Sequence, residues 1–589
     1  MARKIRDAFL FVLLTIVFLA TLYHQALRGA GSISPTDDVV VRPDFQPHAY
    51  LPTANQIIHE DVIPQNNTHP KTKASPSSSS PLLSDSTVSI LLPDWEVLVL
   101  VSPEVAEPDL ATSEYEYTCL FDNNVTSPAN FTGILPSDQA RATFKCILPN
   151  RVRQKLPYRL PVLIRSSEVS NPPARLTPSP ELLRWNFLVY DSLSTEDDVV
   201  LFAKGVNKRQ GFNRDPTELR CVFGDDLANG VRTNVTSSLQ EVFRCQRPNL
   251  TDVILSGGKG GGEELVKVTL EFVGDGKLVP TVAHYRPWRK VASDEAKSRV
   301  CAATMVFNVA KFLKEWVTYY SRIGVEKFIL YDNNSGDNLQ EVIEGLVKEG
   351  YDVKTVSWIW PKTQEAGFSH AAVYAKDHCE WMMFMDVDEF VYSPSWSNSS
   401  EPLESMIPSL LPKSNSSVSS SSSVGRPPVG QISIVCLEFG PSGQKSHPAA
   451  GVTQGYNCRS RVENRHKSIV RLDAVDHSLL NVIHHFRLKN GYRAKKMRIN
   501  EVVVNHYKYQ AWTEFKAKFK RRVSAYVVDW REKVNLNSQD RTPGLGYVAE
   551  EPKNWLHAFC QVHDNRLKDL TRRWFGVESP SGNHMAWQI

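Results

Sequence analysis

Residues 299–308 read Arg299-Val-Cys-Ala-Ala-Thr-Met-Val-Phe-Asn308, an apolar run with the length of a buried strand. Downstream, helical and strand patterns alternate, and Gly350 ends the second helix. This order predicts an α/β domain with a parallel sheet covered by helices. Ligands of such sheets bind beyond the carboxyl ends of the strands. The expected elements are a strand over 299–308, a helix over 309–324, a strand from 327, a helix over 338–350 and a strand over 353–360.

Further along, the apolar run Trp381-Met-Met-Phe-Met leads directly into Asp386-Val-Asp388. Residues i and i+2 of an extended chain point to the same side. Two carboxylates there repel each other unless a divalent cation lies between them. Such a cation binds the diphosphate of a nucleotide and neutralises it as it leaves. The pattern predicts a metal–diphosphate site, with a surface turn as the alternative; Glu389-Phe390 does not fit a haloacid-dehalogenase-type phosphatase.

Upstream, residues 86–292 consist of short β-type runs separated by Gly, Pro and Asn, which predicts a β-sandwich. A pattern recurs within this region. Cys119-Leu-Phe-Asp is followed by Phe144-Lys-Cys146, and Cys221-Val-Phe-Gly is followed by Phe243-Arg-Cys245. We expect two related hairpins, each closed by its own disulfide, Cys119–Cys146 and Cys221–Cys245; two coincident cysteine pairs are the alternative.

The N-terminal region predicts a membrane anchor. Basic residues within 1–7 precede the apolar run Ala8–Tyr23, whose length as a helix would be about 24 Å. Basic residues on that side keep it cytoplasmic, so 8–27 reads as a signal anchor and the remainder as lumenal. A cleaved signal peptide is the alternative. The Pro- and Ser-rich segment 28–85 reads as a disordered stem.

Composition narrows the class of protein. Apolar residues make up 41%, charged residues 22% and aromatic residues 10%, which excludes a disordered, collagen-like or multi-spanning chain. Lys and Arg number 68 against 64 Asp and Glu, so bulk charge gives no reason to expect a nucleic-acid partner. Nine cysteines without a Cys-x-x-Cys motif favour disulfides over zinc ribbons. Sequons that suit a secretory route begin at Asn66, Asn124, Asn130, Asn234, Asn249, Asn333, Asn398 and Asn415.

An ordered series of motifs resembles glycosyltransferase family 92, which includes the plant galactan β-1,4-galactosyltransferases. The resemblance covers about 299–575, and residues 86–292 look like the carbohydrate-binding module of the galactan synthases. The Ser-rich segment 412–428, which we expect to be a disordered loop, departs from the family's compact core. The motifs are Phe328-Ile-Leu-Tyr-Asp-Asn-Asn-Ser, Met385-Asp-Val-Asp-Glu-Phe, Phe439-Gly-Pro-Ser-Gly, His466-Lys-Ser-Ile-Val-Arg, His484-His-Phe and Asn505-His-Tyr.

The resemblance implies a GT-A type, Rossmann-like catalytic domain over 293–578, followed by a tail over 579–589. It also implies a nucleotide-sugar donor, a Mn²⁺ (or Mg²⁺) ion and inversion at the anomeric carbon. By this analogy Asp386 and Asp388 bind metal and diphosphate, and His506 completes the metal shell. Asp332 would contact the donor's nucleoside, with a turn-forming Asp as the alternative.

Two basic residues, Lys467 and Arg471, are expected to hold the donor phosphates, with plain solvated charges as the alternative. An inverting transfer also needs a base near the acceptor hydroxyl. Glu463 is the candidate, with Glu438, Asp473 and Asp476 as alternatives.

Three further features remain open in the sequence. His484-His485 lacks a partner at zinc-ligand spacing and is expected near the acceptor cleft. The basic stretch 513–522 reads as a solvated helix face, or as a contact for an acidic polysaccharide. Cys436–Cys458 is a plausible disulfide, which leaves the pairing of Cys301, Cys379 and Cys560 open.

The sequence therefore predicts a single-pass type II Golgi membrane protein that moves galactose from UDP-galactose onto a β-galactan or another galactosylated glycan. Its expected partners are the nucleotide sugar, the glycan acceptor and the membrane, with the oligomeric state open. The alternatives are a non-catalytic glycan-binding protein and a metal-dependent phosphohydrolase.

Overall fold

The computed structural model describes residues 87–101, 117–135, 141–154, 156–166, 180–207, 212–249, 265–289, 296–412, 426–482, 484–518, 551–580 and 582–589. The chain divides into two compact units, 1–69 and 70–589, and all described residues lie in the second. The expected anchor at 8–27 and stem at 28–85 lie outside the described residues. None of the helices within the described ranges is long and apolar enough to cross a bilayer.

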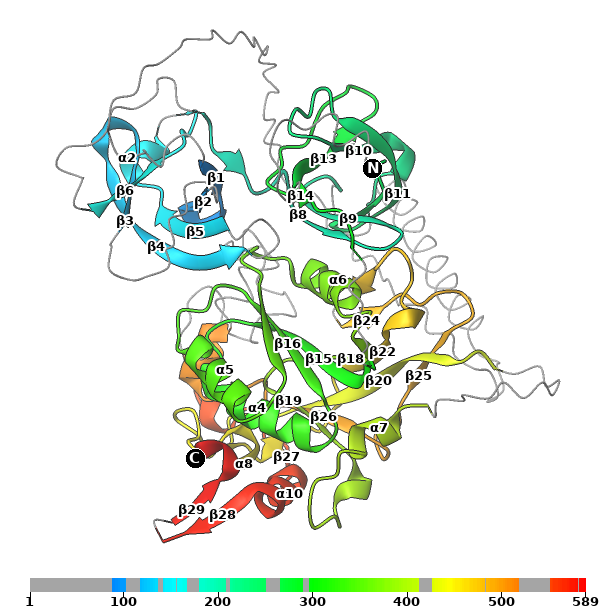
Figure 1. Ribbon diagram of the computed structural model, residues 1–589. Helices are drawn as coiled ribbons and strands as arrows, with labels where there is room; N and C mark the ends of the chain where they lie inside the picture. The colour runs from blue at the N-terminus through cyan, green and yellow to red at the C-terminus, as the bar shows by residue number, and fades with distance from the viewer. Residues whose placement is uncertain are drawn as a thin grey trace, which may run out of the picture. The chain divides into compact units, whose positions relative to one another are not determined.

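The first module, residues 87–184, is built on a seven-stranded sheet (Figure 1). The strands follow the order β6-β3-β4-β5-β2-β1-β7, and only β7 joins its neighbour in parallel. Alternate apolar residues such as Val97, Val99 and Phe144 form its own core. The strands are β1 (Thr87–Leu91), β2 (Glu96–Val101), β3 (Tyr117–Leu120), β4 (Thr126–Leu135), β5 (Arg141–Ile147), β6 (Val162–Arg165) and β7 (Leu183–Arg184), with the short helix α2 (Asn150–Arg153) after β5.

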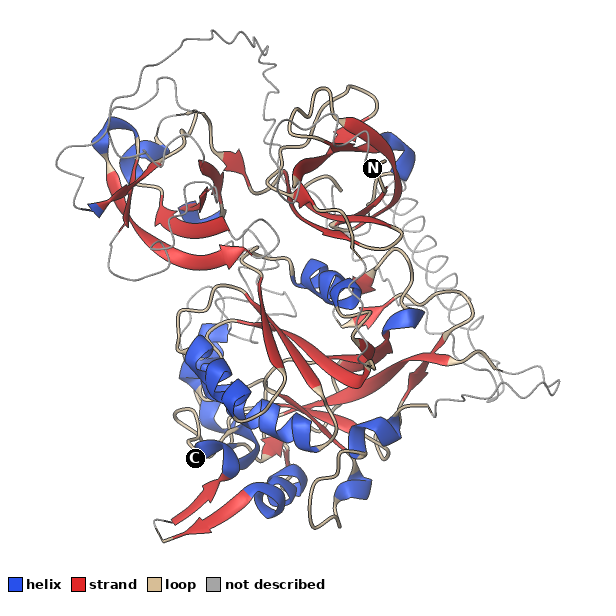
Figure 2. Cartoon of the chain, viewed as in Figure 1, coloured by secondary structure: helices blue, strands red, loops and turns tan. Residues whose placement is uncertain are grey.

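The second module, residues 188–285, is a seven-stranded antiparallel sheet in the order β14-β13-β10-β11-β12-β9-β8. It too has its own core, around Leu201, Phe223 and Phe243. Figure 2 shows that both modules consist almost entirely of strands and loops. The strands are β8 (Leu188–Ser194), β9 (Asp198–Lys204), β10 (Leu219–Phe223), β11 (Val231–Leu239), β12 (Val242–Gln246), β13 (Val266–Phe272) and β14 (His284–Tyr285).

These two modules repeat one topology. Adding seven to each label converts the order β6-β3-β4-β5-β2-β1 into β13-β10-β11-β12-β9-β8. The disulfides Cys119–Cys146 and Cys221–Cys245 join matching strands, β3 to β5 and β10 to β12, which confirms both expected pairs. The repeat is larger than the predicted hairpin, and two sheets with separate cores replace the single β-sandwich that we expected over 86–292.

The C-terminal domain, residues 296–589, contains a nine-stranded sheet in the order β17-β16-β15-β18-β22-β20-β26-β19, with β25 beside β20. The first four strands of this order are parallel, as the sequence predicts, and β22 joins β18 antiparallel. The strands are β15 (Ser298–Val306), β16 (Lys327–Asp332), β17 (Val353–Ser357), β18 (Cys379–Phe384), β19 (Glu389–Tyr392), β20 (Val429–Glu438), β22 (His466–Arg471), β25 (Arg493–Lys496) and β26 (Val503–His506).

Both faces of this sheet are covered because successive strand residues point to opposite sides. Val300 and Ala302 pack with Phe312 and Trp316 of α4, whereas Cys301 and Ala303 belong to a different cluster with α6. That second cluster also contains Trp185, Tyr190 and Phe202 of the second module. The larger helices of the domain are α4 (Ala310–Arg322), α5 (Leu339–Lys348), α6 (Gln364–Tyr374) and α10 (Arg566–Phe575).

Shorter elements complete the domain. The expected tail at 579–589 is instead folded, since Met585 and Trp587 belong to the main core and are buried. Residues 513–518 of the basic stretch are helical, and 413–425 of the Ser-rich segment lie outside the described ranges. These elements are α7 (Met406–Leu410), α8 (Val452–Gly455), β21 (Cys458–Arg459), β23 (Asn481–Val482), β24 (His485–Phe486), β27 (Val562–His563), β28 (Gly576–Ser579), β29 (Gly582–Met585) and the 3₁₀ helix η10 (Ala586–Gln588).

The cysteine pairs of the C-terminal domain correct one prediction. Cys301 bonds to Cys379, Cys458 bonds to Cys560, and Cys436 is a free, buried thiol. The proposed Cys436–Cys458 bond is therefore wrong. Cys436 lies within β20, in the core between neighbouring strands, whereas Cys458 is in β21 beside β27.

Candidate functional site

The two aspartates follow β18, but they do not continue it. The strand ends at Phe384, and Val387 and Asp388 form a turn before β19. The Asp386 backbone N–H donates to Glu389 Oε2 over 2.9 Å, which fixes this turn. Because the chain is not extended here, the two carboxylates meet different partners.

Asp386 contacts a buried lysine. Lys467 Nζ lies 3.0 Å from Asp386 Oδ2, 2.7 Å from Glu389 Oε1 and 2.6 Å from His484 Nε2. The lysine comes from β22, whose Ser468 pairs with Phe384 at the end of β18. The prediction that Lys467 lies at the aspartates is therefore confirmed.

The charges in this cluster compensate one another. Burial alone would raise the pKa of Asp386, but Lys467 and His484 outweigh it and hold that pKa well below its usual range. Burial lowers the pKa of Lys467, yet Asp386 and Glu389 raise it above its ordinary value. Burial, together with nearby Asp386 and Asp388, raises the pKa of Glu389 to about 8. Asp386 keeps a third of its side chain exposed, so it is the member of this trio that solvent reaches.

Asp388 lies against a second set of residues. His506 Nε2 is 3.6 Å from both Asp388 Oδ2 and Glu389 Oε1, because β26 pairs antiparallel with β19 and sets His506 opposite Glu389. Lys518 Nζ lies 2.6 Å from Asp388 Oδ2. Burial and then Lys467 hold the pKa of His506 well below its usual range, so its imidazole is neutral.

The described residues test whether a divalent cation fits. As the side chains stand, the described part of the chain holds no group of three or more His, Cys, Asp or Glu arranged to bind a metal. Lysine ammonium groups balance both aspartates instead. The donor chemistry nevertheless suits Mn²⁺ or Mg²⁺, since Asp388 offers a carboxylate beside the neutral imidazole of His506. Such a cation would have to displace Lys518 from Asp388.

Asp332 ends β16 at the carboxyl edge of the parallel strands. Its Oδ1 accepts hydrogen bonds from the N–H and the hydroxyl of Ser335, at 3.0 and 2.6 Å. These contacts give Asp332 the turn-stabilising role that the sequence left as an alternative. Asn308 follows β15 and accepts from Gly336 N, so the turns after these two strands are tied together.

The remaining candidates lie at different distances from the aspartates. Glu463 is exposed in the loop before β22, and no contact among the described residues joins it to Asp386 or Asp388. Arg471 is at the far end of β22, opposite Trp381 rather than Phe384. The structure thus does not bring either residue to the cluster.

The alternative bases also separate. Glu438 pairs in register with His506 and accepts from Lys508 Nζ over 2.6 Å, which brings it close to the cluster, although it is buried. Asp476 accepts from Ser478, as a turn residue does, and Asp473 lies in a 3₁₀ turn after β22.

Sequence reasoning missed four residues of this cluster. Glu389 adjoins the aspartates in the sequence, and its acidic character immediately after Asp388 was the available signal. His484 belongs to the histidine pair that the sequence analysis placed near the acceptor cleft; it contacts Lys467, while His485 contacts His466. Lys508 and Lys518 carried no signal because their contacts depend on how the chain returns after β26.

The predicted glycosylation sites divide into three groups. Asn333 donates its amide to the carbonyl oxygens of Trp358 and Trp360, at 2.6 and 3.2 Å, so the folded chain uses this nitrogen internally. Asn66 and Asn415 lie outside the described residues. The exposed sequon residues are Asn124, Asn130, Asn234, Asn249 and Asn398.

Comparison with known proteins gives a consistent family. A sequence model of glycosyltransferase family 92 matches residues 296–539. A family 92 protein of Ricinus communis is 38% identical over 526 residues, covering 87% of this chain and 86% of its own. One of Oryza sativa subsp. japonica is 39% identical over 424 residues (69% and 68%), and one of Arabidopsis thaliana is 41% identical over 415 residues (69% and 69%).

Solved structures add little. A mannosyltransferase of Pyrobaculum calidifontis in complex with GDP-Man and Mn²⁺ is 13% identical, with a TM-score of 0.23, and covers 49% of this chain and 77% of its own. A glucosyl-3-phosphoglycerate synthase of Mycobacterium tuberculosis is 11% identical, with a TM-score of 0.16, over 30% of this chain and 58% of its own. Scores this low support no inference about fold or ligand.

Proposed function

Because the chain belongs to glycosyltransferase family 92, we propose that it transfers galactose from UDP-galactose onto a β-galactan or another galactosylated glycan, with inversion. The observation that carries this proposal is the buried charge cluster of Asp386, Asp388, Glu389, Lys467 and His506 at the end of β18. A cluster of this kind suits a diphosphate, because its lysine and its cation-binding carboxylates both act on phosphate oxygens. We propose that the C-terminal domain is of the GT-A type.

Each member of the cluster has a separate part in this proposal. Lys467 orients Asp386 and balances the buried charge of Glu389. Asp388 and His506 would hold Mn²⁺ or Mg²⁺, which supplies the positive charge that stabilises the leaving UDP. Glu438 is the nearer of the candidate bases to these residues, and Glu463 stays a prediction from the sequence alone.

The exposed sequons support a secretory route, which agrees with the proposed type II anchor at 8–27 and a Golgi location. A mature chain there would present its modules and its transferase domain to the lumen. The described residues neither include the anchor nor bear on the oligomeric state.

The test uses the full-length chain, solubilised in detergent from a glycosylating host. We expect UDP release from UDP-galactose that rises with β-1,4-galactan oligosaccharides and falls when EDTA removes the cation. Asp388→Ala should lower turnover by at least a hundredfold without unfolding the protein, the scale of losing one charge-stabilising group. The exposed Asp377→Ala serves as the matched control.

Three outcomes separate the proposals. Release from another UDP-sugar keeps the reaction and replaces the donor. A folded Asp388→Ala protein with full activity contradicts the metal assignment. Inert donors combined with tight glycan binding would favour the non-catalytic alternative, which the pairing of both aspartates with lysines also suits.

A further inference from the structure

Two hollows on the C-terminal domain adjoin each other. The larger has a volume of about 580 Å³ and the smaller about 430 Å³, and Ala449 and Gln588 line both. Volumes of this size suit small-molecule or oligosaccharide binding. We call the two together the trough.

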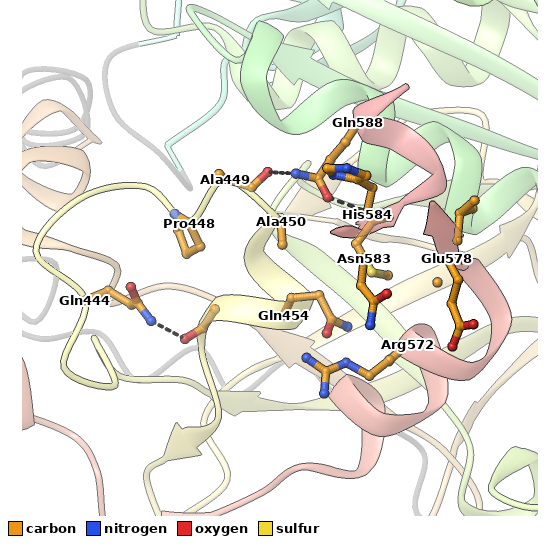
Figure 3. Close-up of a pocket in the computed structure, with 14 residues that line it drawn as sticks. Gln444, Pro448, Ala449, Ala450, Gln454, Arg572, Glu578, Asn583, His584 and Gln588 are labelled. Carbon is orange, nitrogen blue, oxygen red and sulfur yellow. Dashed lines mark hydrogen bonds between the residues drawn. The ribbon is translucent and has the colours of Figure 1, made fainter. Parts of the chain in front are cut away.

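The walls of the trough are held together by specific hydrogen bonds (Figure 3). Gln588 Nε2 donates to Ala449 O and Trp587 Nε1 donates to Ala450 O, both over 3.1 Å. These bonds fasten η10 and the β28–β29 hairpin to the loop before α8. Gln444 Nε2 donates to Gly455 O over 3.0 Å and fixes the opposite side. The trough is therefore a built feature rather than a gap between loose segments.

Its floor contains an acceptor atom without a donor. Gln454 Nε2 donates to Thr571 Oγ1 over 2.7 Å and to Lys568 O over 3.0 Å, so the amide cannot flip without losing both bonds. Its Oε1 is buried and has no hydrogen-bond partner among the described residues. Only 7% of Gln454 is exposed. A buried carbonyl oxygen left unpaired costs about 1–3 kcal/mol, so a hydroxyl donor from a ligand would stabilise it.

The rim adds donors that suit the same ligand. Arg572 and Asn583 line the larger hollow with Gln454, and Figure 3 shows all three around it. Amide and guanidinium groups hydrogen-bond the hydroxyl and ring oxygens of a sugar, while Pro448 and Met585 offer apolar surface to its C–H face. Glu578 lines the same hollow and would repel a polyanion, so a neutral glycan fits better.

One end of the trough lies close to the proposed active site. His447 lines the smaller hollow, and its ring centroid is 4.8 Å from that of Phe312. Lys518 Nζ lies 5.4 Å from the centroid of Phe312 and 2.6 Å from Asp388 Oδ2. Two side chains thus separate the trough from Asp388.

We propose that the trough binds the acceptor's neutral glycan chain, at sugars beyond the one that receives the transfer. This proposal rests on the proposed transferase function and extends it to a polymeric acceptor. It assigns Gln454, Arg572 and Asn583 as contacts that hold the chain, with no part in the chemical step.

The experiment measures transfer by the full-length chain onto β-1,4-galactan oligosaccharides of increasing length. For the wild type, we expect KM to fall as the oligosaccharide grows. Arg572→Ala and Asn583→Ala should each raise KM for long acceptors roughly three- to tenfold, the scale of one lost hydrogen bond, and should flatten this dependence on length. Asp569→Ala, exposed on the same helix α10 and outside the trough, should match the wild type. Thermal unfolding of every variant separates lost binding from lost folding.

Direct binding separates failure of this inference from failure of the proposed function. In a native gel containing β-1,4-galactan, the wild type should be retarded and Arg572→Ala less so, whether or not transfer occurs. An active wild type whose Arg572 and Asn583 variants behave like Asp569→Ala overturns the trough and leaves the transferase standing. Retardation by polygalacturonate in place of galactan overturns the neutral glycan, and an absence of retardation in both gels overturns the glycan site altogether.

Discussion

The two β modules share a strand order and a matching disulfide, yet they have different neighbours. The second module supplies hydrogen bonds to the C-terminal domain: Trp360 Nε1 donates to Asp191 Oδ2 over 2.9 Å, and Lys204 Nζ donates to Lys362 O over 3.0 Å. Trp185 stacks on Trp360 at 5.8 Å between ring centroids. The first module reaches the second through Arg141, which donates to Val282 O over 2.8 Å.

This comparison shows how one fold takes two positions. The segment that carries Trp358 and Trp360 also accepts from Asn333, the residue after Asp332. The second module therefore supports the turn at the carboxyl edge of β16 from behind. In contrast, the first module presents side chains such as Trp95 and Phe131 at the surface, at 39% and 45% exposure.

The largest effect should come from removing the shared tryptophan. Trp360→Ala deletes a buried indole, its stacking on Trp185 and its bond to Asp191, at a cost of about 3–5 kcal/mol. Denaturant unfolding measures this loss. Trp95→Ala in the first module should cost under about 1 kcal/mol, and equal losses for the two variants would mean that the modules do not differ as described.

Next come the two matching disulfides. They close loops of similar length, with sequence separations of 27 and 24, so replacing either pair by alanine should cost about 3.5 kcal/mol of stability. The consequences should differ in place. Loss of Cys221–Cys245 should speed amide exchange in β16 and β17, whereas loss of Cys119–Cys146 should speed exchange within β2 to β5 only. The comparison fails if both variants expose β17 equally.

A pH effect should distinguish the C-terminal domain from both modules. Glu315 of α4 is buried and accepts from Val452 N and from the N–H and hydroxyl of Thr453. Burial raises its pKa to about 7, despite these bonds. The folded state therefore binds this proton more tightly than the unfolded chain does. Its stabilising contribution is complete below pH 4.5 and is lost as the pH rises toward 7, by about 2–3 kcal/mol in all.

Unfolding curves from pH 4.5 to 8 check this expectation. Glu315→Gln should reduce the slope of stability against pH, which is read in preference to the absolute stability because the amide cannot accept all three bonds. Exchange should rise with pH around α4 and α8 and not in either module. An unchanged slope in the variant would assign the pH dependence to other groups.

The smallest effect concerns Asp191. Asp191→Ala leaves the buried Trp360 N–H without this acceptor and should cost about 1–2 kcal/mol. Asp197→Ala, on the exposed turn between β8 and β9, is the control and should change stability by less than about 0.5 kcal/mol. A loss as small as that of the control would show that stacking alone holds the two tryptophans together.

The sequence predicted the parallel strands because their apolar runs alternate with amphipathic helices, as in 299–360. It predicted two disulfides because each pair closes a local hairpin. It could not predict that Cys458 joins Cys560, 102 residues away, or that Lys518 meets Asp388. Such contacts depend on strand order in the finished sheet. The full extent of the repeat also escaped sequence reasoning, because the burial pattern of a strand constrains residue type only loosely.

The position of Cys436 has a consequence for how the protein matures. Eight cysteines are oxidised in pairs, and a ninth thiol in the same compartment would attack those bonds if it ionised in reach of them. Cys436 is 1% exposed, and burial together with Glu389 holds its pKa well above the usual range. Thiolate, the attacking species, is thus suppressed once β20 is in the sheet. The folded domain protects its own crosslinks from exchange by keeping the odd sulfur protonated and out of reach.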